Sequence, residues 1–171
     1  MLQLSPKLFI EVGRKVPYAQ EVLTYSSDEI DSHHSMKYET DILIGQKISR
    51  DQWSPRVIIE GKIESVTTHD AITYSQKSAT HKSVHPYLRY GILLGNRGHY
   101  PLPGRLFRHG AHFDFMLSWQ GFKPTISEWR RFVDFLEDEL AASRHLEEII
   151  FNSRSKNRKP YTLLHRPLRL M

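Results

Sequence analysis

The chain has 171 residues and a net charge of +5, and it contains no cysteine. The length predicts one domain with a sizeable core, and the missing cysteines exclude disulfides, thiol catalysis and cysteine-ligated zinc or iron–sulfur sites. No apolar run reaches a membrane helix and the N-terminus does not resemble a signal peptide, so we expect an intracellular, cytoplasmic protein with no membrane partner. The basic charge favours an anionic partner, nucleic acid first.

The N-terminal part of the chain predicts one helix and two strands. Pro17 is suited to the first turn of a helix within Leu8–Thr24, and the polar stretch 26–37 predicts a loop. Alternation predicts a strand over Tyr38–Gln46. A polar, hairpin-like connection, Lys47–Pro55, leads to a second strand, Arg56–Val66, whose β-branched start is typical of a buried central position.

The C-terminal part predicts two helices, two strands and a long loop. A helix is expected over Thr68–Val84, with a capping arrangement at its start, and a strand over Leu88–Gly95. The stretch 96–111 predicts a functional or disordered loop. Alternation over His112–Trp119 predicts a strand. Thr125, with Glu128 completing a capping box, predicts the start of a last helix, whose helical spacing extends to Phe151.

This order of elements predicts an α/β fold with three layers and a mixed central sheet, in which the second strand, the helix and the third strand form a parallel crossover. We expect a single domain over 1–152. Residues 153–171 are rich in Lys and Arg, and they predict either a nucleic-acid-binding tail or a solvated end, partly docked on the body.

One cluster of polar residues interrupts the apolar strands. Glu60 and Lys62 are two residues apart on one predicted strand, so they point to the same face, and Asp41 belongs to the predicted strand before it. If these two strands are neighbours, the two carboxylates lie close together. Two carboxylates there can share one Mg²⁺ ion, with the carbonyl of Gly61 completing the site, and the glycine lets a phosphate backbone approach closely. Lys62 would position or activate the attacking water. The alternative to a metal site is a surface strand with an ordinary Glu–Lys pair that has no catalytic function.

Asp41 followed by Glu60-Gly61-Lys62 on a hydrophobic strand resembles the motif of the PD-(D/E)XK nuclease superfamily, which includes many type II restriction endonucleases. The resemblance covers roughly Leu8 to Trp119. It departs from the motif at Thr40, because the motif has proline at this position. It implies a restriction-endonuclease-like core and a DNA endonuclease that uses Mg²⁺, with Mn²⁺ as a substitute. It also implies a further acidic metal ligand from the first helix, and Glu21 fits that place.

Similar nucleases use the helix that follows the catalytic strand near the active site or the DNA backbone. The polar residues of that helix here, and arginines of the following loop, are the candidate DNA contacts: Gln76, Lys77, His81, Lys82, Arg97, Arg105 and Arg108. Lys77 and His81 are one helical turn apart, so we expect them to face outward together. An exposed helix face without function is the alternative for the helix residues.

The sequence therefore predicts a Mg²⁺-dependent DNA endonuclease of restriction type or of another DNA-processing role. Cutting both strands would require a homodimer, two encounters or a partner chain. Two other hypotheses stay open: a non-catalytic nucleic-acid-binding module with the nuclease fold, and a structural or protein-interaction domain. Salt-sensitive DNA binding would count against the last of these.

Overall fold

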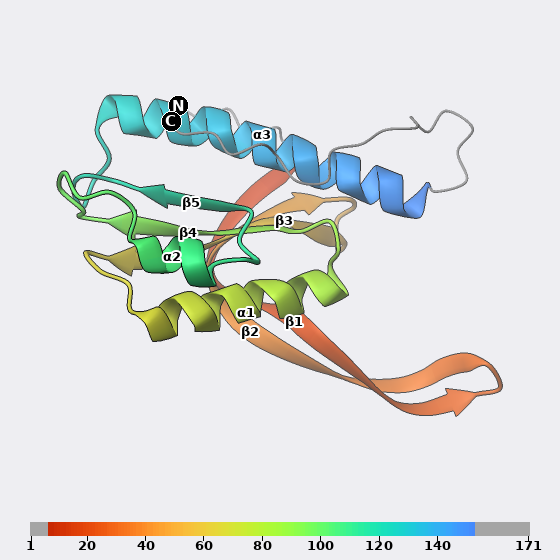
Figure 1. Cartoon of the computed structure of the whole chain (residues 1–171). Coiled ribbons are helices and arrows are strands. Elements are labelled where there is room, and N and C mark those ends of the chain that lie inside the picture. The colour runs from red at the N-terminus through yellow and green to blue at the C-terminus, as the bar shows by residue number, and fades with distance from the viewer. Residues whose placement is uncertain (1–6, 153–171) are drawn as a thin grey trace.

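The computed structural model describes residues 7–152, which form an α/β fold with a five-stranded mixed sheet and helices on both of its faces (Figure 1). The sheet order is β1-β2-β3-β4-β5; neighbours are antiparallel from β1 to β3 and parallel from β3 to β5. Helix α3 covers one face, and α1 and α2 cover the other. The elements are β1 (Leu8–Ser26), β2 (Glu29–Lys47), β3 (Trp53–Ile63), α1 (Thr68–Val84), β4 (Arg89–Gly95), α2 (Gly104–His109), β5 (Phe115–Ser118) and α3 (Ile126–Phe151). The predicted α/β class and mixed sheet are confirmed.

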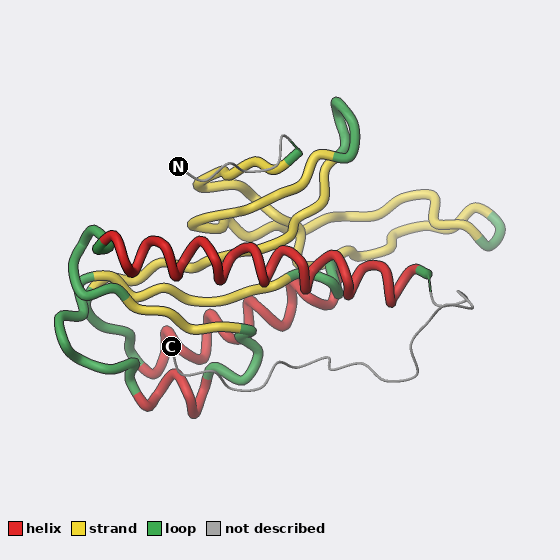
Figure 2. Tube along the Cα trace, turned by 90° about the horizontal axis from the view of Figure 1, so that it is seen from above, coloured by secondary structure: helices red, strands yellow, loops and turns green. Residues whose placement is uncertain are grey.

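Strands β1 and β2 form one long antiparallel hairpin, whose outer part leaves the body of the molecule (Figure 2). The predicted helix within Leu8–Thr24 and the predicted loop over 26–37 are therefore wrong. β-Branched and aromatic residues recur along β1, which favours a strand. Pro17 is tolerated because β1 is an edge strand and its pairing register shifts just after this residue.

The crossover from β3 through α1 to β4 follows the prediction closely. Residues Val57–Ile59 are fully buried in β3, and β3 pairs with β4 in parallel. Helix α1 begins with a capping box, in which the Thr67 hydroxyl accepts a hydrogen bond from the Asp70 amide and the Asp70 carboxylate accepts one from the Thr67 amide. This cap fixes the first turn of α1 directly after the end of β3.

The segment between β4 and α3 is more ordered than its composition indicates. The predicted loop over 96–111 contains the short helix α2, which buries Leu106. Strand β5 is shorter than predicted, and Phe113 packs toward α2 rather than sharing a face with Phe115. Helix α3 begins at the predicted capping box of Thr125 and extends to Phe151.

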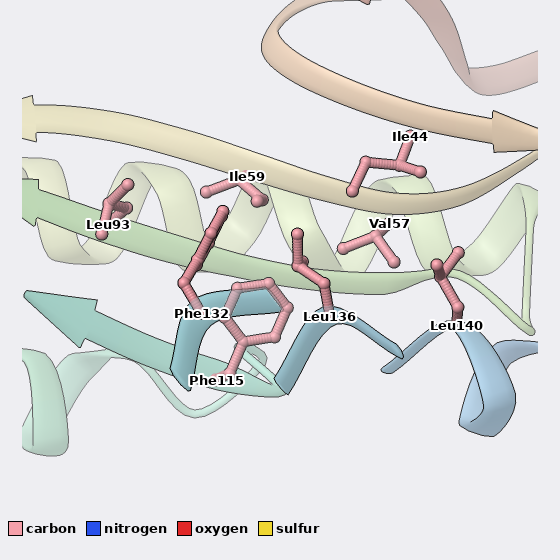
Figure 3. Packing of buried hydrophobic residues seen from close by; sticks show 8 residues of the cluster. All are labelled: Ile44, Val57, Ile59, Leu93, Phe115, Phe132, Leu136 and Leu140. Atoms are coloured by element: carbon pink, nitrogen blue, oxygen red, sulfur yellow. The ribbon is translucent and has the colours of Figure 1, made fainter. Parts of the chain in front are cut away.

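Two apolar layers hold the sheet between the helices. Figure 3 shows the layer beneath α3, where Phe132, Leu136 and Leu140 pack on Ile44, Val57, Ile59, Leu93 and Phe115. The opposite layer packs α1 and α2 on Ile92 and Leu94 of β4. Side chains of β3 therefore alternate between the two layers, so Ile58, Glu60 and Lys62 face α1.

The predicted basic tail, residues 153–171, lies outside the described residues. Within residues 7–152, no helix combines the length and the apolar character that crossing a membrane requires.

Candidate active site

Asp41 and Glu60 lie side by side on neighbouring strands. Ile42 pairs with Ile59, so the antiparallel register brings Asp41 level with Glu60. The carboxylate of Asp41 accepts a hydrogen bond of 2.7 Å from the amide of Gly61. A side chain at Gly61 would meet only the Asp41 carboxylate, at 3.7 Å, so the strand is open to a ligand at this point.

Glu60 is almost completely buried, and only 2% of it is exposed. Its Oε1 accepts a hydrogen bond of 2.5 Å from the hydroxyl of Tyr90 on β4. Burial raises the pKa of Glu60, and the neighbouring Asp41 raises it further, whereas the Tyr90 hydrogen bond and the charge of Lys77 lower it. Burial, and then the negative charge of Glu60, raise the pKa of Tyr90, so the phenol keeps its proton and acts as a donor.

Lys62 faces the first turns of α1. Its ammonium group forms an ion pair of 3.2 Å with Asp70 and lies 4.9 Å from the ring centre of Tyr74. A hydrogen bond to Tyr74, followed by the contact with Asp70, raises the pKa of Lys62, although partial burial lowers it. Hydrogen bonds from Thr67 lower the pKa of Asp70 to about 2. The capping box of α1 therefore also holds the lysine of the predicted motif.

Lys77 supplies a second ammonium group beside the two carboxylates. It lies 5.2 Å from the ring centre of Tyr38 and 5.1 Å from that of Tyr74. Its charge also lowers the pKa of Glu60. Lys62 and Lys77 thus both contact the ring of Tyr74, and the structure brings the predicted contact Lys77 together with the predicted catalytic cluster.

His81 does not face outward with Lys77 as the helical spacing predicted, because it is completely buried. Its Nδ1 lies 3.0 Å from the carbonyl of Pro17, and its ring contacts Tyr38 and Tyr90. Burial lowers the pKa of His81 to about 4. The base of the β1–β2 hairpin covers this face of α1. The burial of His81 was not predicted because Leu8–Thr24 was assigned to a helix rather than to this hairpin.

Glu21 is not near the cluster. It is exposed in the outer part of the hairpin, where it pairs with His34 of β2. Thr40, the residue before Asp41, pairs with Arg14, so the cluster lies near Arg14 along β1. Glu21 is seven positions beyond Arg14 along β1, a distance of about 20 Å in an extended strand. The expectation of an acidic metal ligand from a first helix is therefore wrong, because Leu8–Ser26 forms strand β1.

The remaining predicted DNA contacts divide into two groups. Gln76, Arg105 and Arg108 are exposed. Lys82 is bound to Asp114 and to the carbonyl of His112, and Arg97 donates to the carbonyls of Glu64 and Pro101. Lys82 and Arg97 thus hold elements of this chain together, which the sequence did not indicate.

Sequence reasoning missed three tyrosines around the cluster, Tyr38, Tyr74 and Tyr90. Tyr90 had a usable signal, because it stands in a fully buried strand, and a buried phenol needs a hydrogen-bond partner. Tyr38 and Tyr74 had no comparable signal, since their contacts depend on where α1 lies over the sheet.

The donor set fits a hard divalent cation of the kind that keeps several waters. Within residues 7–152, no group of three or more His, Asp or Glu side chains is arranged to hold a metal. Mg²⁺ is commonly bound by one or two carboxylates, with water and substrate phosphate completing its coordination. Asp41 and Glu60 provide that pair. Burial first, and then the charge of Asp41, raise the pKa of Glu60, and a bound cation would offset both effects.

No protein-family model and no curated protein matches this chain. The function of the cluster is therefore argued from its own geometry and chemistry.

Proposed function

We propose that this chain is a Mg²⁺-dependent DNA endonuclease that hydrolyses phosphodiester bonds, with Asp41, Glu60 and Lys62 at its centre. The observation that carries the proposal is the pairing of a buried carboxylate, Glu60, with Asp41, where the charge of Lys77 acts on Glu60. The ammonium group of Lys62 lies on the same side of the sheet and shares the ring of Tyr74 with Lys77. The mixed sheet between helices is compatible with the restriction-endonuclease-like core that the motif implies. A restriction role, rather than another DNA-processing role, rests on that resemblance alone.

Asp41, Glu60 and the carbonyl of Gly61 would hold the cation. A bound Mg²⁺ ion supplies a water of lowered pKa and neutralises charge on the scissile phosphate. The hydrogen bond from Tyr90 orients Glu60, and the amide of Gly61 orients Asp41, so both carboxylates are preorganised.

Lys62 and Lys77 would stabilise the negative charge that develops on the phosphate. Both ammonium groups contact the ring of Tyr74, and Lys62 is already oriented by Asp70. Lys77 has the more direct electrostatic contact with Glu60, since its charge acts on the pKa of that carboxyl group. We assign Lys62 to the attacking water and Lys77 to the phosphate.

Gln76, Arg105 and Arg108 are the proposed contacts with the DNA backbone, because they are exposed and lie on the α1 and α2 side of the sheet. Arginine suits this role because its guanidinium group forms two parallel hydrogen bonds with a phosphate. Lys82, Arg97 and the buried His81 are left out, since their donors are already engaged or are inaccessible.

A non-catalytic nucleic-acid-binding module is the second candidate. One observation favours it: Lys62 is engaged by Asp70 rather than free beside the carboxylates. In such a module, Asp41 and Glu60 would be dispensable for DNA binding, and no cutting would occur.

The test is nicking and linearisation of supercoiled plasmid with Mg²⁺, beside EDTA, by wild type, Lys62→Ala, Lys77→Ala and the exposed control Lys47→Ala. We expect Mg²⁺-dependent cutting, reduced roughly a hundredfold or more by loss of either site lysine and unchanged in the control. DNA binding without cutting by wild type would favour the binding module. A wild-type protein that neither binds nor cuts DNA would contradict both candidate functions.

A further inference from the structure

The outer part of the β1–β2 hairpin, residues Gln20–Asp31, has an unusual environment, and we refer to it as the arm. Every residue of the arm is exposed, on both faces of the two strands. Figures 1 and 2 show that it extends away from the sheet and helices. A two-stranded hairpin with no third layer is only marginally stable in water, so a surface that covers the arm would stabilise it.

Large apolar side chains are exposed near the tip of the arm, directly behind its polar turn of Ser27 and Asp28. Tyr25 pairs with Ile30 across the hairpin, and their exposed fractions are 65% and 56%. Leu23, on the same strand as Tyr25, is 65% exposed. Large apolar side chains gathered at one exposed tip mark a contact surface for protein.

The charge of the arm excludes DNA as the partner of this surface. The arm contains four carboxylates, those of Glu21, Asp28, Glu29 and Asp31, and residues 16–36 contain no Lys or Arg. Such a segment is repelled by phosphates, whereas the chain as a whole has a net charge of +5. The surface that the arm fits is therefore a basic protein surface with exposed apolar groups.

This chain itself carries such a surface, around the start of α3. Phe122, Ile126 and Trp129 are 67%, 76% and 41% exposed, and Lys123 and Arg130, their direct neighbours in the sequence, are exposed as well. We refer to these five residues as the basic-aromatic patch. The patch lies at the left end of α3 in Figure 1, and the arm tip lies at the opposite, right-hand end of the molecule, as Figure 2 also shows.

We propose that the arm of one chain docks on the basic-aromatic patch of a second copy of this chain, and that the contact is reciprocal in a two-fold dimer. Because arm and patch lie at opposite ends, an arm does not reach the patch of its own chain. Two chains arranged antiparallel bring each arm to the patch of the other, and a two-fold axis then makes both contacts equivalent. The dimer is independent of the proposed catalytic role of Asp41 and Glu60.

The test is sedimentation velocity of the full chain without DNA or metal, over a wide range of concentrations. The variants are Tyr25→Ser and Glu29→Arg in the arm, Arg130→Glu in the patch and Glu137→Arg as an exposed charge-reversal control on α3. Wild type and Glu137→Arg should dimerise. Each arm or patch variant should associate at least roughly tenfold more weakly, because apolar and charged contacts at the centre of an interface dominate affinity.

Mixing Glu29→Arg with Arg130→Glu distinguishes this contact from a general loss of solubility. In the mixed dimer, one arm and one patch are both wild type, and the second contact has its charges exchanged. The mixture should therefore dimerise more strongly than either variant alone. Wild type that stays monomeric, arm variants that dimerise like wild type, or a mixture that gains nothing would each overturn the proposal. Circular dichroism checks that every variant is folded.

Discussion

A carboxylate as deeply buried as that of Glu60 opposes folding unless its charge is compensated. The Tyr90 hydroxyl and the charge of Lys77 compensate it only in part, since its pKa is still raised. The glutamine of Glu60→Gln has nearly the same shape, keeps the acceptor for Tyr90 and carries no charge. We predict that this variant, without metal, is at least as stable as wild type in urea unfolding.

The same comparison with added Mg²⁺ tests the assignment of Glu60 as a ligand. A ligand that binds only the folded state raises the free energy of unfolding. Mg²⁺ should therefore stabilise wild type and leave Glu60→Gln unchanged, with Glu137→Gln as the matched control that responds like wild type. Equal stabilisation of Glu60→Gln would place the cation elsewhere.

His81 makes stability depend on pH in a defined window. Its pKa is about 4 in the folded chain and 6.5 ordinarily, so the unfolded state binds more protons between these values. The neutral His81 contributes fully to the free energy of unfolding above about pH 6.5, and this contribution decreases as the pH falls toward about 4. The charges of Lys77 and His85, which lower the pKa, and the carbonyl of Pro17, which raises it, are the groups that act on the imidazole.

His81→Asn removes the titration and retains a donor for the Pro17 carbonyl. We predict that wild type loses more free energy of unfolding than His81→Asn does when the pH falls from about 7 to about 5. Glu60, whose pKa is raised, acts in the opposite direction, and His85, whose pKa is lowered by burial, acts in the same direction as His81. Both groups are present in wild type and in the variant, so the difference between the two proteins reports on His81. Denaturant unfolding of both proteins at both pH values measures this difference. Equal losses of the free energy of unfolding in wild type and His81→Asn would contradict a buried neutral imidazole.

At the scale of an element, the first turn of α1 connects stability with the site. Thr67→Ala removes the cap and should destabilise the protein by about 1 kcal/mol. It also removes the hydroxyl that holds Asp70, the ion-pair partner of Lys62, so any cutting activity should fall as well. Thr125→Ala removes the equivalent cap of α3, which is far from the cluster, and should reduce stability by a similar amount without reducing activity.

The elements that local patterns specify were predictable from the sequence, and those that depend on distant partners were not. The apolar run of β3, both capping boxes and the helical spacing of α3 are local signals, and all are confirmed. The helix predicted within Leu8–Thr24 was wrong because Pro17 was interpreted as a helix start, whereas pairing with β2 decides the conformation of this segment.

The candidate site divides in the same way. Alternation along β3 placed Glu60 and Lys62 toward one helix layer, and the pairing of β2 with β3 brings Asp41 beside Glu60. The burial of His81, the position of Tyr74 between two lysines and the distance of Glu21 all follow from how α1 and the hairpin lie on the sheet. Spacing within one segment carries no information about such contacts.

At the scale of the whole molecule, the charges are unevenly distributed, with acidic residues in the arm and exposed arginines on α2. DNA binding should therefore weaken as salt increases, because each phosphate contact releases counterions. Arg105→Ala and Arg108→Ala should each reduce the salt slope by about one contact, and the arm variant Glu29→Arg should not reduce it. Fluorescence anisotropy with labelled duplex DNA over a salt series measures these slopes.

The measurement that tests the central claim most directly is plasmid cleavage by wild type and Glu60→Gln in the same Mg²⁺ buffer, using preparations whose stability is already known. We predict that wild type nicks the plasmid and that Glu60→Gln, although folded, does not. Cutting by Glu60→Gln at the rate of wild type would contradict the assignment of Asp41 and Glu60 as the reactive pair.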